Sequence, residues 1–526
     1  MVLGLPAAVN RTKTFQGAVC VLNSLQYKSS ASERLHVRQE NPGLQLQNMH
    51  GFLQRTGITV NELDKLNVIH VTGTKGKGST CAFTERVLRG YGFKTGFYSS
   101  PHLVHVRERI RLNGRPISEQ LFCKYFWETY EQLEDTKDNR GGSMPFYFQL
   151  LTLMAFHVFL QERVDVAVIE VGIGGQYDCT NIIRKPWVCG ITSLELDHCS
   201  LLGDTLEKIA WQKAGIFKPG VPAFTVRQKA GPLRVLLHRA EDIRCPLWVC
   251  PELDQYETLV GPVHLGLTGE HQRSNASLAL QLSNSWLQRH RARETGDDLS
   301  LALPSCRPGS QAAIFQPSSA MLEGLQETDW LGRNQKLSCG SVTYYLDGAH
   351  TTDSMQACVS WFRQETMHRD KTQGPGVRIL LFNTTGERDS AALLRLLLPC
   401  QFDYALFCPN NTDSPANSSA APHSSSECAA TSRCRENLRI WQSLNTTFNQ
   451  QHYHLVASSV SGSLVFPCIL SALRWIRQRK HPQSVTPQSS ESPHRLREGG
   501  QVSVLVTGSL YLVGGVLRHL EPSVDS

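Results

Sequence analysis

Strand-like runs of β-branched residues alternate with helical patterns over most of this chain, and this alternation constrains the fold more than any other feature. It extends from about Leu44 to about Leu325. Strands that are joined by helices run parallel, because each helix returns the chain to the edge at which the previous strand began. The sequence therefore predicts an α/β fold in which helices cover a parallel sheet.

A second, smaller α/β domain is predicted from about Trp330 onward, because a new set of apolar runs begins there. Its strand candidates are Val342–Leu346, Val377–Phe382, Tyr404–Phe407 and Val502–Val506. Two low-complexity segments, near 411–434 and 477–500, interrupt the alternation. Both lack apolar periodicity, so we expect surface loops there.

These patterns divide the chain into three parts. Residues 1–43 form an N-terminal segment, residues 44–326 the first domain and residues 327–526 the second. The mixed polar stretch from His290 to Ser310 contains Pro and Gly, and it is predicted to be a loop or an insertion.

Composition excludes several classes of protein. The longest strongly apolar stretch, Leu150–Leu160, is too short to span a bilayer. The formal net charge is +7, from 53 Lys and Arg against 46 Asp and Glu, which is mild for 526 residues. It suits an anionic small ligand, and no basic stripe of the kind that binds nucleic acid accompanies it. We therefore expect neither a membrane span nor a nucleic-acid partner.

The 16 cysteines are scattered and form no paired CxxC clusters, so structural zinc is not expected. No signal peptide is visible, and we interpret the cysteines as reduced thiols of a cytoplasmic or organelle-matrix protein. The first acidic residue is Glu33, whereas Arg11, Lys13 and Lys28 precede it. An acid-free start is typical of a mitochondrial transit segment, and a frayed N-terminus explains it equally well.

The strongest local motif is a glycine loop between a strand and a helix. The β-branched run Val68–Thr72 leads into Gly73–Gly78, and a helical pattern follows over Ser79–Arg89. In this context backbone N–H groups converge on phosphate oxygens, and Lys77 adds a mobile positive charge. The residue after Lys77 is glycine, so the hydroxyl of the usual motif is displaced to Ser79. A glycine-rich turn with solvated lysines is the alternative, but the flanking strand and helix favour nucleotide binding.

Candidate metal ligands follow other predicted strands. Glu170 ends the apolar run Val164–Glu170, where a neighbouring phosphate loop would hold Mg²⁺. His198 follows the run Val188–Ser193, and Ser100 closes the strand after the first helix. From position alone, a helix-capping or surface glutamate is the alternative for Glu170, a lone histidine is more often structural, and Ser100 is unremarkable.

Together and in this order, these motifs resemble those of the folylpolyglutamate synthases, which are relatives of the Mur ligases of cell-wall synthesis. The eukaryotic members are most similar, since Met144–Leu160 also resembles them. The resemblance spans residues 66 to 350 and returns at the C-terminal end. Its motifs are HVTGTKGKGS at 70–79, SSPHL at 99–103, EVGIGG at 170–175, DCTN at 178–181, LDH at 196–198, QKAGI at 212–216, GEHQ at 269–272, WLGR at 330–333, DGAH at 347–350 and VTGSL at 506–510.

This resemblance implies a P-loop parallel-sheet ATPase domain followed by a smaller Rossmann-like α/β domain. It implies an ATP-dependent ligase that adds L-glutamate to the γ-carboxylate of tetrahydrofolates through an acyl phosphate, making folylpolyglutamates that are retained for one-carbon metabolism. The implied cofactors are ATP and Mg²⁺, with a second Mg²⁺ and a monovalent cation such as K⁺ as further candidates. Reduced folate and L-glutamate are the implied substrates of a cytoplasmic monomer with a mitochondrial-matrix form.

The resemblance also assigns roles to individual residues. The residues that bind the ATP phosphates are Gly76, Lys77, Gly78 and Ser79. The Mg²⁺ ligands are Ser100, Glu170 and His198. The other nucleotide contacts are Gln272 and Asn275 beside the adenine, Arg333 on phosphate and Asp347 on ribose. Lys213 matches a lysine that is carbamylated in the superfamily, and it joins Lys77, Glu170 and His198 as a catalytic residue.

The pteridine ring of a folate needs an apolar or aromatic slot. Its candidates are Phe146, Tyr147, Phe148 and the loop His102–Arg109, although aromatic residues at this spacing are more often part of a core. Two other functions remain as alternatives. One is a related amide ligase, a dihydrofolate synthase or a Mur-type enzyme, and the other is a nucleotide-binding switch.

Overall fold

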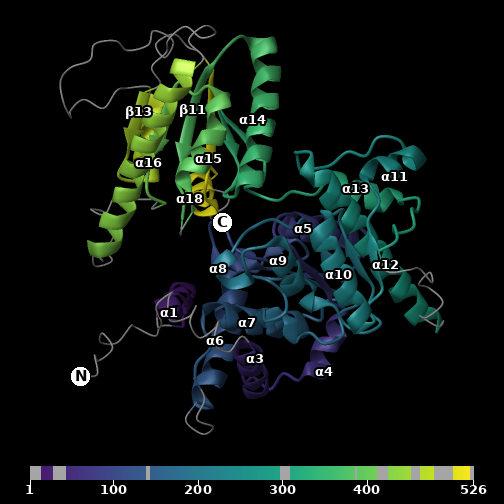
Figure 1. Ribbon diagram of the computed structural model, residues 1–526. Coiled ribbons are helices and arrows are strands. Elements are labelled where there is room, and N and C mark those ends of the chain that lie inside the picture. The colour runs from purple at the N-terminus through teal and green to yellow at the C-terminus, as the bar shows by residue number, and fades with distance from the viewer. Residues whose placement is uncertain are drawn as a thin grey trace. The chain divides into compact units, whose positions relative to one another are not determined.

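The structure is a computed structural model of the 526-residue chain. The residues that it describes are 13–27, 43–137, 143–296, 309–385, 388–410, 424–451, 462–478 and 501–521. The chain forms two compact units, each with its own sheet (Figure 1). The first unit consists of Met1–His102, Val106–Gly266 and His271–Asp329, and the second of Leu103–His105, Leu267–Glu270 and Trp330–Ser526.

The first unit contains an eight-stranded sheet in the order β4-β3-β2-β5-β1-β6-β7-β8. Its strands are β1 (Ile69–Thr72), β2 (Thr95–Tyr98), β3 (Ile110–Leu112), β4 (Arg115–Pro116), β5 (Val166–Glu170), β6 (Val188–Ile191), β7 (Ala223–Thr225) and β8 (Leu247–Val249). The run from β2 to β8 is parallel, and β3 and β4 extend it as an antiparallel edge. The predicted α/β fold with a parallel sheet is confirmed.

Helices cover both faces of this sheet. They are α3 (Leu44–Arg55), α4 (Val60–Leu63), α5 (Lys77–Gly90), α6 (Glu119–Asp135), α7 (Tyr147–Gln161), α8 (Cys199–Leu202), α9 (Leu206–Lys213), α10 (Ala230–Ile243), α11 (Leu253–Val260), α12 (His271–Thr295) and α13 (Ser319–Gln326). Strand β6 shows the two faces. Cys189 and Ile191 belong to the core under α9 and α10, whereas a Cβ on Gly190 would meet Leu282 of α12. This alternation is that of a strand buried on both faces.

The N-terminal segment contributes helix α1 (Phe15–Tyr27) to the first unit. Ala18, Leu22 and Leu25 are buried in the core that α6 and α7 share. The ring of Phe15 lies edge-on to that of Phe122 of α6, with centroids 5.4 Å apart. This part of the segment is therefore a packed element of the first unit.

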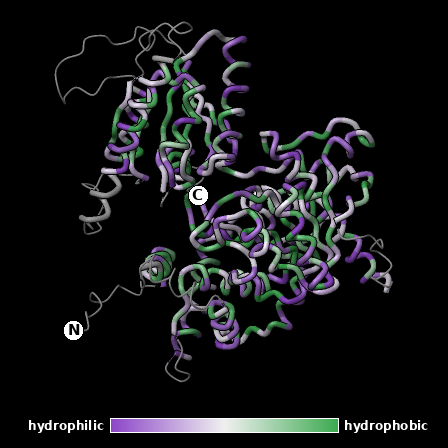
Figure 2. Tube along the Cα trace, in the orientation of Figure 1, coloured by the Kyte–Doolittle hydropathy of each residue, from purple (hydrophilic) through white to green (hydrophobic). Residues whose placement is uncertain are grey.

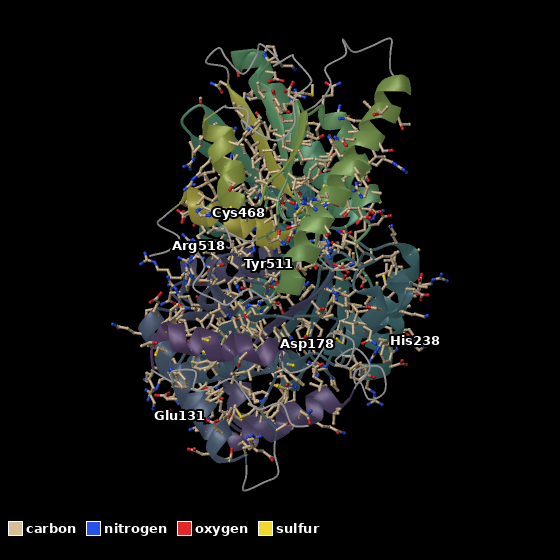
Figure 3. The ribbon with its side chains drawn as sticks, turned by 90° about the vertical axis from the view of Figure 1, so that its left-hand side faces the viewer. Glu131, Asp178, His238, Cys468, Tyr511 and Arg518 are labelled. Carbon is tan, nitrogen blue, oxygen red and sulfur yellow. The ribbon has the colours of Figure 1, made fainter. Side chains whose placement is uncertain are left out.

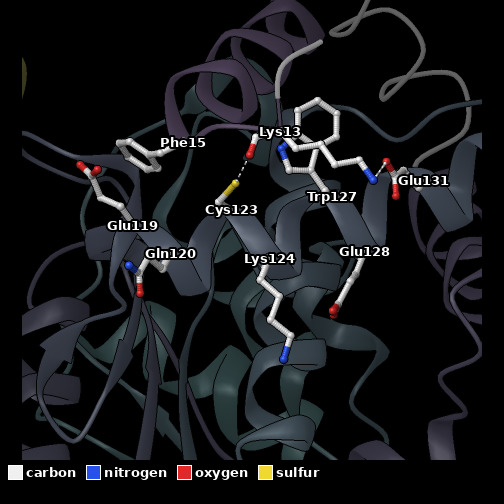
Figure 4. A pocket seen from close by; sticks show the side chains of 9 residues that line it. All are labelled: Lys13, Phe15, Glu119, Gln120, Cys123, Lys124, Trp127, Glu128 and Glu131. Atoms are coloured by element: carbon white, nitrogen blue, oxygen red, sulfur yellow. Dashed lines mark hydrogen bonds and ion pairs between the residues drawn. The ribbon is translucent and has the colours of Figure 1, made fainter.

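A pocket of about 580 Å³ lies beside the start of α1, along one side of α6 (Figure 4). Lys13 pairs with Glu131 there at 2.7 Å, and the thiol of Cys123 donates to the carbonyl oxygen of Lys13 at 3.1 Å. These two contacts attach the residues before α1 to the surface of α6.

The second unit contains a six-stranded sheet in the order β13-β12-β11-β14-β10-β9. Its strands are β9 (Gln335–Cys339), β10 (Val342–Leu346), β11 (Val377–Phe382), β12 (Tyr404–Phe407), β13 (Gly462–Val465) and β14 (Val502–Thr507). All pairs are parallel except that of β9 with β10. The four strands predicted here are confirmed, and hydrophobic residues concentrate along them (Figure 2).

The helices of the second unit lie on opposite faces of its sheet. They are α14 (Thr352–Gln373), α15 (Ser390–Leu397), α16 (Ser424–Gln451), α17 (Ile469–Gln478) and α18 (Leu510–Leu520). One core contains residues of α14, α15 and α16, and the other contains residues of α17 and α18. The second unit is thus a three-layer α/β structure.

Two short segments from within residues 44–326 fold with the second unit. They are Leu103–His105 and Leu267–Glu270. Leu103 packs against the core that contains Val513, and a Cβ on Gly514 would lie 2.0 Å from the carbonyl oxygen of Leu103. Glycine is needed at position 514 because the two backbones approach so closely. The predicted first domain, residues 44–326, includes both segments, whereas in the structure they belong to the second unit.

Two of the predicted loops are partly helical. The stretch His290–Ser310 begins inside α12, which ends at Thr295, and α16 starts at Ser424, inside the segment near 411–434. Both predictions are wrong for those residues. In α16 the side chains of Cys434 and Trp441 are buried in the core of the second unit, so tertiary packing stabilises a helix that local composition does not favour. Residues 297–308, 411–423 and 479–500 lie outside the described part.

Within the described residues, no helix is both long enough and apolar enough to cross a membrane. The cysteines of this part of the chain are free thiols.

Truncation of Leu22 in α1 tests whether the N-terminal helix stabilises the first unit. Leu22 is fully buried, so Leu22→Ala is expected to lower the free energy of unfolding of this unit by about 2–5 kcal/mol, through lost burial and the cavity left behind. Urea unfolding measures the change. The neighbouring Asn23 is exposed, and Asn23→Ala is the matched control. Equal unfolding midpoints for the two variants would contradict the packing role of α1.

Candidate active site at the carboxyl edge of the first sheet

Four parallel strands of the first unit end beside one another. In register, Val71 of β1 lies beside Glu170 of β5, and Thr72 lies beside Ile191 of β6. Tyr98 of β2 lies beside Ile169. The loops that follow these strands therefore emerge at one edge, which is where open α/β sheets bind ligands.

The glycine loop after β1 has a backbone that only glycine accommodates. Gly76 has φ +85° and directly precedes α5. A Cβ on Gly76 would lie 2.2 Å from Oδ1 of Asn275, and one on Gly73 would lie 1.7 Å from Oγ1 of Thr192. The loop thus delivers the chain to the N-terminus of a 14-residue helix, where free backbone N–H groups attract anions. Gly78 and Ser79 belong to the first turn of that helix.

Lys77 faces Glu170 across the two neighbouring strands. Nζ of Lys77 lies 4.0 Å from Oε1 of Glu170, and it donates to the carbonyl oxygen of Thr74 at 3.4 Å. The other carboxylate oxygen of Glu170 accepts the backbone N–H of Ser100 at 3.0 Å. Glu170 is only 4% exposed, so its carboxyl group is buried at the centre of the site.

His198 ends the loop that follows β6. Its backbone is left-handed, with φ +53° and ψ +40°, and it directly precedes α8. His198 is an exposed residue, but desolvation by its surroundings lowers the pKa of its imidazole to about 4, against the opposing effect of Asp197 and with a further contribution from Lys77. The ring is therefore neutral at physiological pH, which is the form that binds a metal ion.

Lys213 at the end of α9 contacts the glycine loop. Its Nζ donates to the carbonyl oxygen of Gly73 at 2.6 Å. Burial lowers the pKa of Lys213 well below its usual range, and Lys77 adds to that effect. An uncharged amine is thus favoured at this position.

The residues at this edge fit a magnesium ion in their chemistry. Glu170 offers a buried carboxylate and Ser100 a hydroxyl from the adjacent strand end, with the neutral imidazole of His198 in the neighbouring loop. The described residues contain no group of three His, Cys, Asp or Glu side chains that could hold a metal. Mg²⁺ does not need one, because it keeps several waters and is bound through one or two carboxylates together with substrate phosphates.

Gln272 and Asn275 lie on the first turns of α12 and meet the glycine loop. Nδ2 of Asn275 donates to Oε1 of Gln272 at 2.9 Å, and both side chains are buried. Eight of the predicted site residues therefore lie in or beside the loops at this edge of the first unit, and contacts join Lys77 to Glu170, Glu170 to Ser100 and Asn275 to Gln272. They are Gly76, Lys77, Ser100, Glu170, His198, Lys213, Gln272 and Asn275.

Arg333 and Asp347 belong to the second unit. Asp347 follows β10 and is 8% exposed. One of its carboxylate oxygens accepts the backbone N–H of Asn334 and the other that of Ala349, both at 2.9 Å. Asp347 thus fixes the loop that carries Arg333, whose Nη1 donates to the carbonyl oxygen of Gly332 at 3.2 Å. Each oxygen of Asp347 keeps a second lone pair for a ligand hydroxyl.

The sequence pattern missed an ion pair in the same cluster. Nζ of Lys75 lies 3.0 Å from Oδ2 of Asp197, and both side chains are largely buried. Nothing in the sequence pairs two residues so far apart in the chain, because the contact arises only when β1 and β6 pair.

A buried polar chain behind the site was also missed. Nε2 of His70 lies 2.9 Å from Oγ1 of Thr180, which donates to Oδ1 of Asp178 at 2.7 Å (Asp178 is labelled in Figure 3). Oδ2 of Asp178 accepts the N–H of Ile173 at 3.0 Å and so fixes the glycine loop after β5. The Asp-x-Thr spacing is a turn signal that could have revealed part of this chain.

The three aromatic candidates for a pteridine slot lie in different environments. Phe146 is 45% exposed, whereas Tyr147 is buried with the guanidinium of Arg109 over its ring at 5.4 Å. Phe148 packs so closely on Gly172 that a Cβ there would lie 2.5 Å from its ring. Nε of Arg109 donates to Nδ1 of His102 at 2.9 Å, which joins the ends of the loop His102–Arg109.

Known proteins resemble this chain along almost its whole length. It is 52% identical to the human protein named "Folylpolyglutamate synthase, mitochondrial", over 99% of this chain and 94% of that protein. It is 38% identical to a folylpolyglutamate synthase of Saccharomyces cerevisiae, over 96% of this chain and 86% of that protein. No protein-family model matches the chain.

Solved structures share the fold. A folylpolyglutamate synthase of Thermotoga maritima matches with a TM-score of 0.64 and 23% identity, and the match covers 97% of each chain. The enzyme of Mycobacterium tuberculosis complexed with ADP matches with a TM-score of 0.67 and 21% identity, over 96% of this chain and 98% of that one.

The buried His70 predicts a pH dependence of stability. Burial lowers its pKa to about 3, and among the described residues its Nδ1 has no hydrogen-bond partner, so the second N–H of a charged ring would have no acceptor. Below the ordinary histidine pKa the unfolded chain binds a proton that the folded chain does not. Stability is therefore complete above pH 6.5 and falls as the pH decreases toward 3, by about 1.4 kcal/mol per pH unit from this group.

Urea unfolding of the wild type and of His70→Gln at pH 8 and pH 5 measures this contribution. We expect the wild type to lose about 2 kcal/mol more than the variant on going to pH 5. Equal losses would show that His70 is not the group responsible.

Proposed function

The chain belongs to the folylpolyglutamate synthase family, and from that premise we propose that it is an ATP-dependent ligase that adds L-glutamate to the γ-carboxylate of tetrahydrofolates. The observation that carries the proposal is the glycine loop at the start of α5, with Lys77 facing Glu170 on the neighbouring strand. Solved structures of the same fold include complexes with ADP and with AMPPCP, which support nucleotide binding by this chain.

The proposed reaction first activates the γ-carboxylate, because a free carboxylate is a poor acyl donor. An oxygen of the folate γ-carboxylate attacks the γ-phosphorus of ATP, and ADP leaves. The amine of L-glutamate then attacks the carbonyl carbon of the acyl phosphate, loses a proton, and inorganic phosphate leaves. The product is a folate with one more glutamate in amide linkage, and the phosphoryl group supplies the leaving group that the free acid lacks.

The residues of the first unit stabilise the charge that moves in this reaction. The N-terminus of α5, with Gly76, Gly78 and Ser79, receives the ATP phosphates, and the ammonium of Lys77 neutralises charge on the transferring group. Ser100, Glu170 and His198 would hold Mg²⁺, which supplies further positive charge to the phosphate oxygens.

Four other residues complete the proposed nucleotide contacts. Gln272 and Asn275 bind near the adenine. The packing of Asn275 on Gly76 supports this assignment. In the second unit, Arg333 contacts phosphate and Asp347 the ribose, supported by the way Asp347 orders the loop of Arg333.

Lys213 is proposed to carry a carbamate, which places an anion beside the glycine loop. Carbon dioxide reacts with the uncharged amine, and the burial of Lys213 favours that form.

A mitochondrial form beside a cytoplasmic one is also part of the proposal, as is a monomeric state. The name of the human relative, which includes the word "mitochondrial", supports the mitochondrial form.

A substrate panel tests the reaction. The purified protein is incubated with ATP, Mg²⁺ and L-glutamate, together with either tetrahydrofolate or dihydropteroate, and the products are separated by mass. We expect tetrahydrofolate to gain glutamates with release of ADP. Ligation to dihydropteroate alone would instead identify a dihydrofolate synthase. ATP turnover that does not depend on glutamate would indicate a nucleotide switch.

Substitutions at Lys77 and Glu170 test the phosphate and metal assignments. Lys77→Ala and Glu170→Ala are each expected to lower kcat/KM by at least about 10²-fold, because each removes a charge that the transition state needs. The thermal melts stay near that of the wild type. Lys65 is exposed, so Lys65→Ala serves as the matched loss of a lysine and keeps full activity. Normal turnover in either site variant would reject its assignment.

A further inference from the structure

The ion pair between Lys75 and Asp197 lies inside the candidate site but has no role in the proposed reaction. Lys75 precedes Gly76 in the glycine loop, and Asp197 precedes His198 in the loop after β6. Their side chains are 20% and 15% exposed, and Nζ lies 3.0 Å from Oδ2. The attraction between two charges that are shielded from water is screened much less than that of a surface pair, so this pair can hold the neighbouring residues in place.

Backbone contacts join the same two loops next to the ion pair. The N–H of Thr74 donates to the carbonyl oxygen of Ser193 at 2.8 Å. Oγ1 of Thr74 accepts the N–H of Glu195 and donates to its carbonyl oxygen, both at 3.1 Å. Oγ of Ser193 donates to the carbonyl oxygen of Lys75 at 3.3 Å. The ion pair is thus the last of a row of contacts that runs along the loop toward His198.

Asp197 connects this row to the backbone of His198. Its Oδ2 receives Lys75, and its Oδ1 accepts the backbone N–H of His198 at 3.0 Å. His198 has φ +53° and ψ +40°, a left-handed conformation that a residue with a Cβ rarely adopts without support from its surroundings. The helix that follows is only four residues long and cannot by itself hold that conformation.

We propose that Lys75 is a positioning residue: through its ion pair with Asp197 it holds the left-handed backbone of His198 and so fixes the direction of the imidazole. This inference rests on the proposed role of His198 as a metal ligand. A ligand held by its neighbours binds a metal more tightly than one that must be ordered first, and such supporting contacts strengthen binding considerably.

The charges of the site agree with this role. The charges of Lys75, Lys77 and Lys213 lower the pKa of the His198 imidazole, and the carboxylate of Asp197 raises it. Asp197 engages the ammonium of Lys75, which leaves Lys77 as the lysine of this loop that faces Glu170. Two lysines two residues apart in one loop therefore have separate tasks.

Three variants separate these tasks. Lys75→Met removes the charge and keeps the length of the side chain. Asp197→Asn removes the pair but keeps Oδ1 as an acceptor for the N–H of His198. The control is Lys208→Met, which breaks a lysine–aspartate pair of 2.9 Å between side chains that are 63% and 77% exposed.

The first measurement needs no metal. Amide hydrogen exchange of the peptide that covers residues 195–202 is followed in metal-free protein. We expect exchange to accelerate by about 5-fold or more in Lys75→Met and Asp197→Asn, and to stay unchanged in Lys208→Met. The double variant should exchange no faster than either single variant, because both remove the same contact. Unchanged exchange in Asp197→Asn overturns the proposal, even where Lys75→Met fails to fold.

The second measurement uses Mn²⁺ as a spectroscopic probe, with ADP present. Electron paramagnetic resonance should show Mn²⁺ binding weakened by about 10-fold or more in both variants, and restored in Lys75→Arg. The affinity for ADP in EDTA should stay within about 2-fold of wild type, since the phosphate contacts remain. Weakened ADP binding in Lys75→Met together with normal Mn²⁺ binding in Asp197→Asn would show instead that Lys75 contacts phosphate directly, and would overturn the proposal.

His198→Ala distinguishes this inference from the function on which it rests. If that variant binds Mn²⁺ as the wild type does, the metal assignment of His198 fails. The exchange experiment still decides whether Lys75 and Asp197 hold the backbone of residue 198.

Discussion

The common edge at which β1, β2, β5 and β6 end is the constraint on which the first unit's site depends. Because these strands are parallel and in register, the glycine loop, Ser100, Glu170 and the loop of His198 emerge together. None of these segments is close to the others in the chain. The pairing of strands buried on both faces therefore brings together site residues that are far apart in the chain.

The site brings three lysines and two carboxylates together around the glycine loop. Lys75, Lys77 and Lys213 surround the glycine loop, with Glu170 and Asp197 as the facing carboxylates. Burial lowers the pKa of both His198 and Lys213, and the neighbouring Lys77 adds to both shifts. In such a cluster, the lysines suit the negative charge of a triphosphate and the carboxylates suit the positive charge of its metal ion.

Strand positions and the glycine loop could be predicted because their signals are local. β-branched runs, glycines before a helix and a carboxylate at the end of a strand each occupy consecutive residues, and the structure has them within a residue or two. The predictions failed where packing outweighed composition. Ser424–Cys434 is helical although it is rich in Ser and Ala, because Cys434 and Trp441 on the same helix are buried against the sheet. Leu103–His105 joins the second unit for a similar reason, since Leu103 finds its apolar partners there.

By itself the sequence determined the α/β class and the glycine loop between a strand and a helix, because both depend on the periodicity or chemistry of neighbouring residues, whereas the candidate ligands Ser100 and His198 came from the resemblance to a family. Only the tertiary structure decided which of those residues meet. The ion pair of Lys75 with Asp197, the chain from His70 through Thr180 to Asp178, and the seating of Asn275 on Gly76 join residues that are far apart in sequence. Such contacts depend on strand order and register, and these are set by the burial of whole faces of the sheet rather than by any single motif.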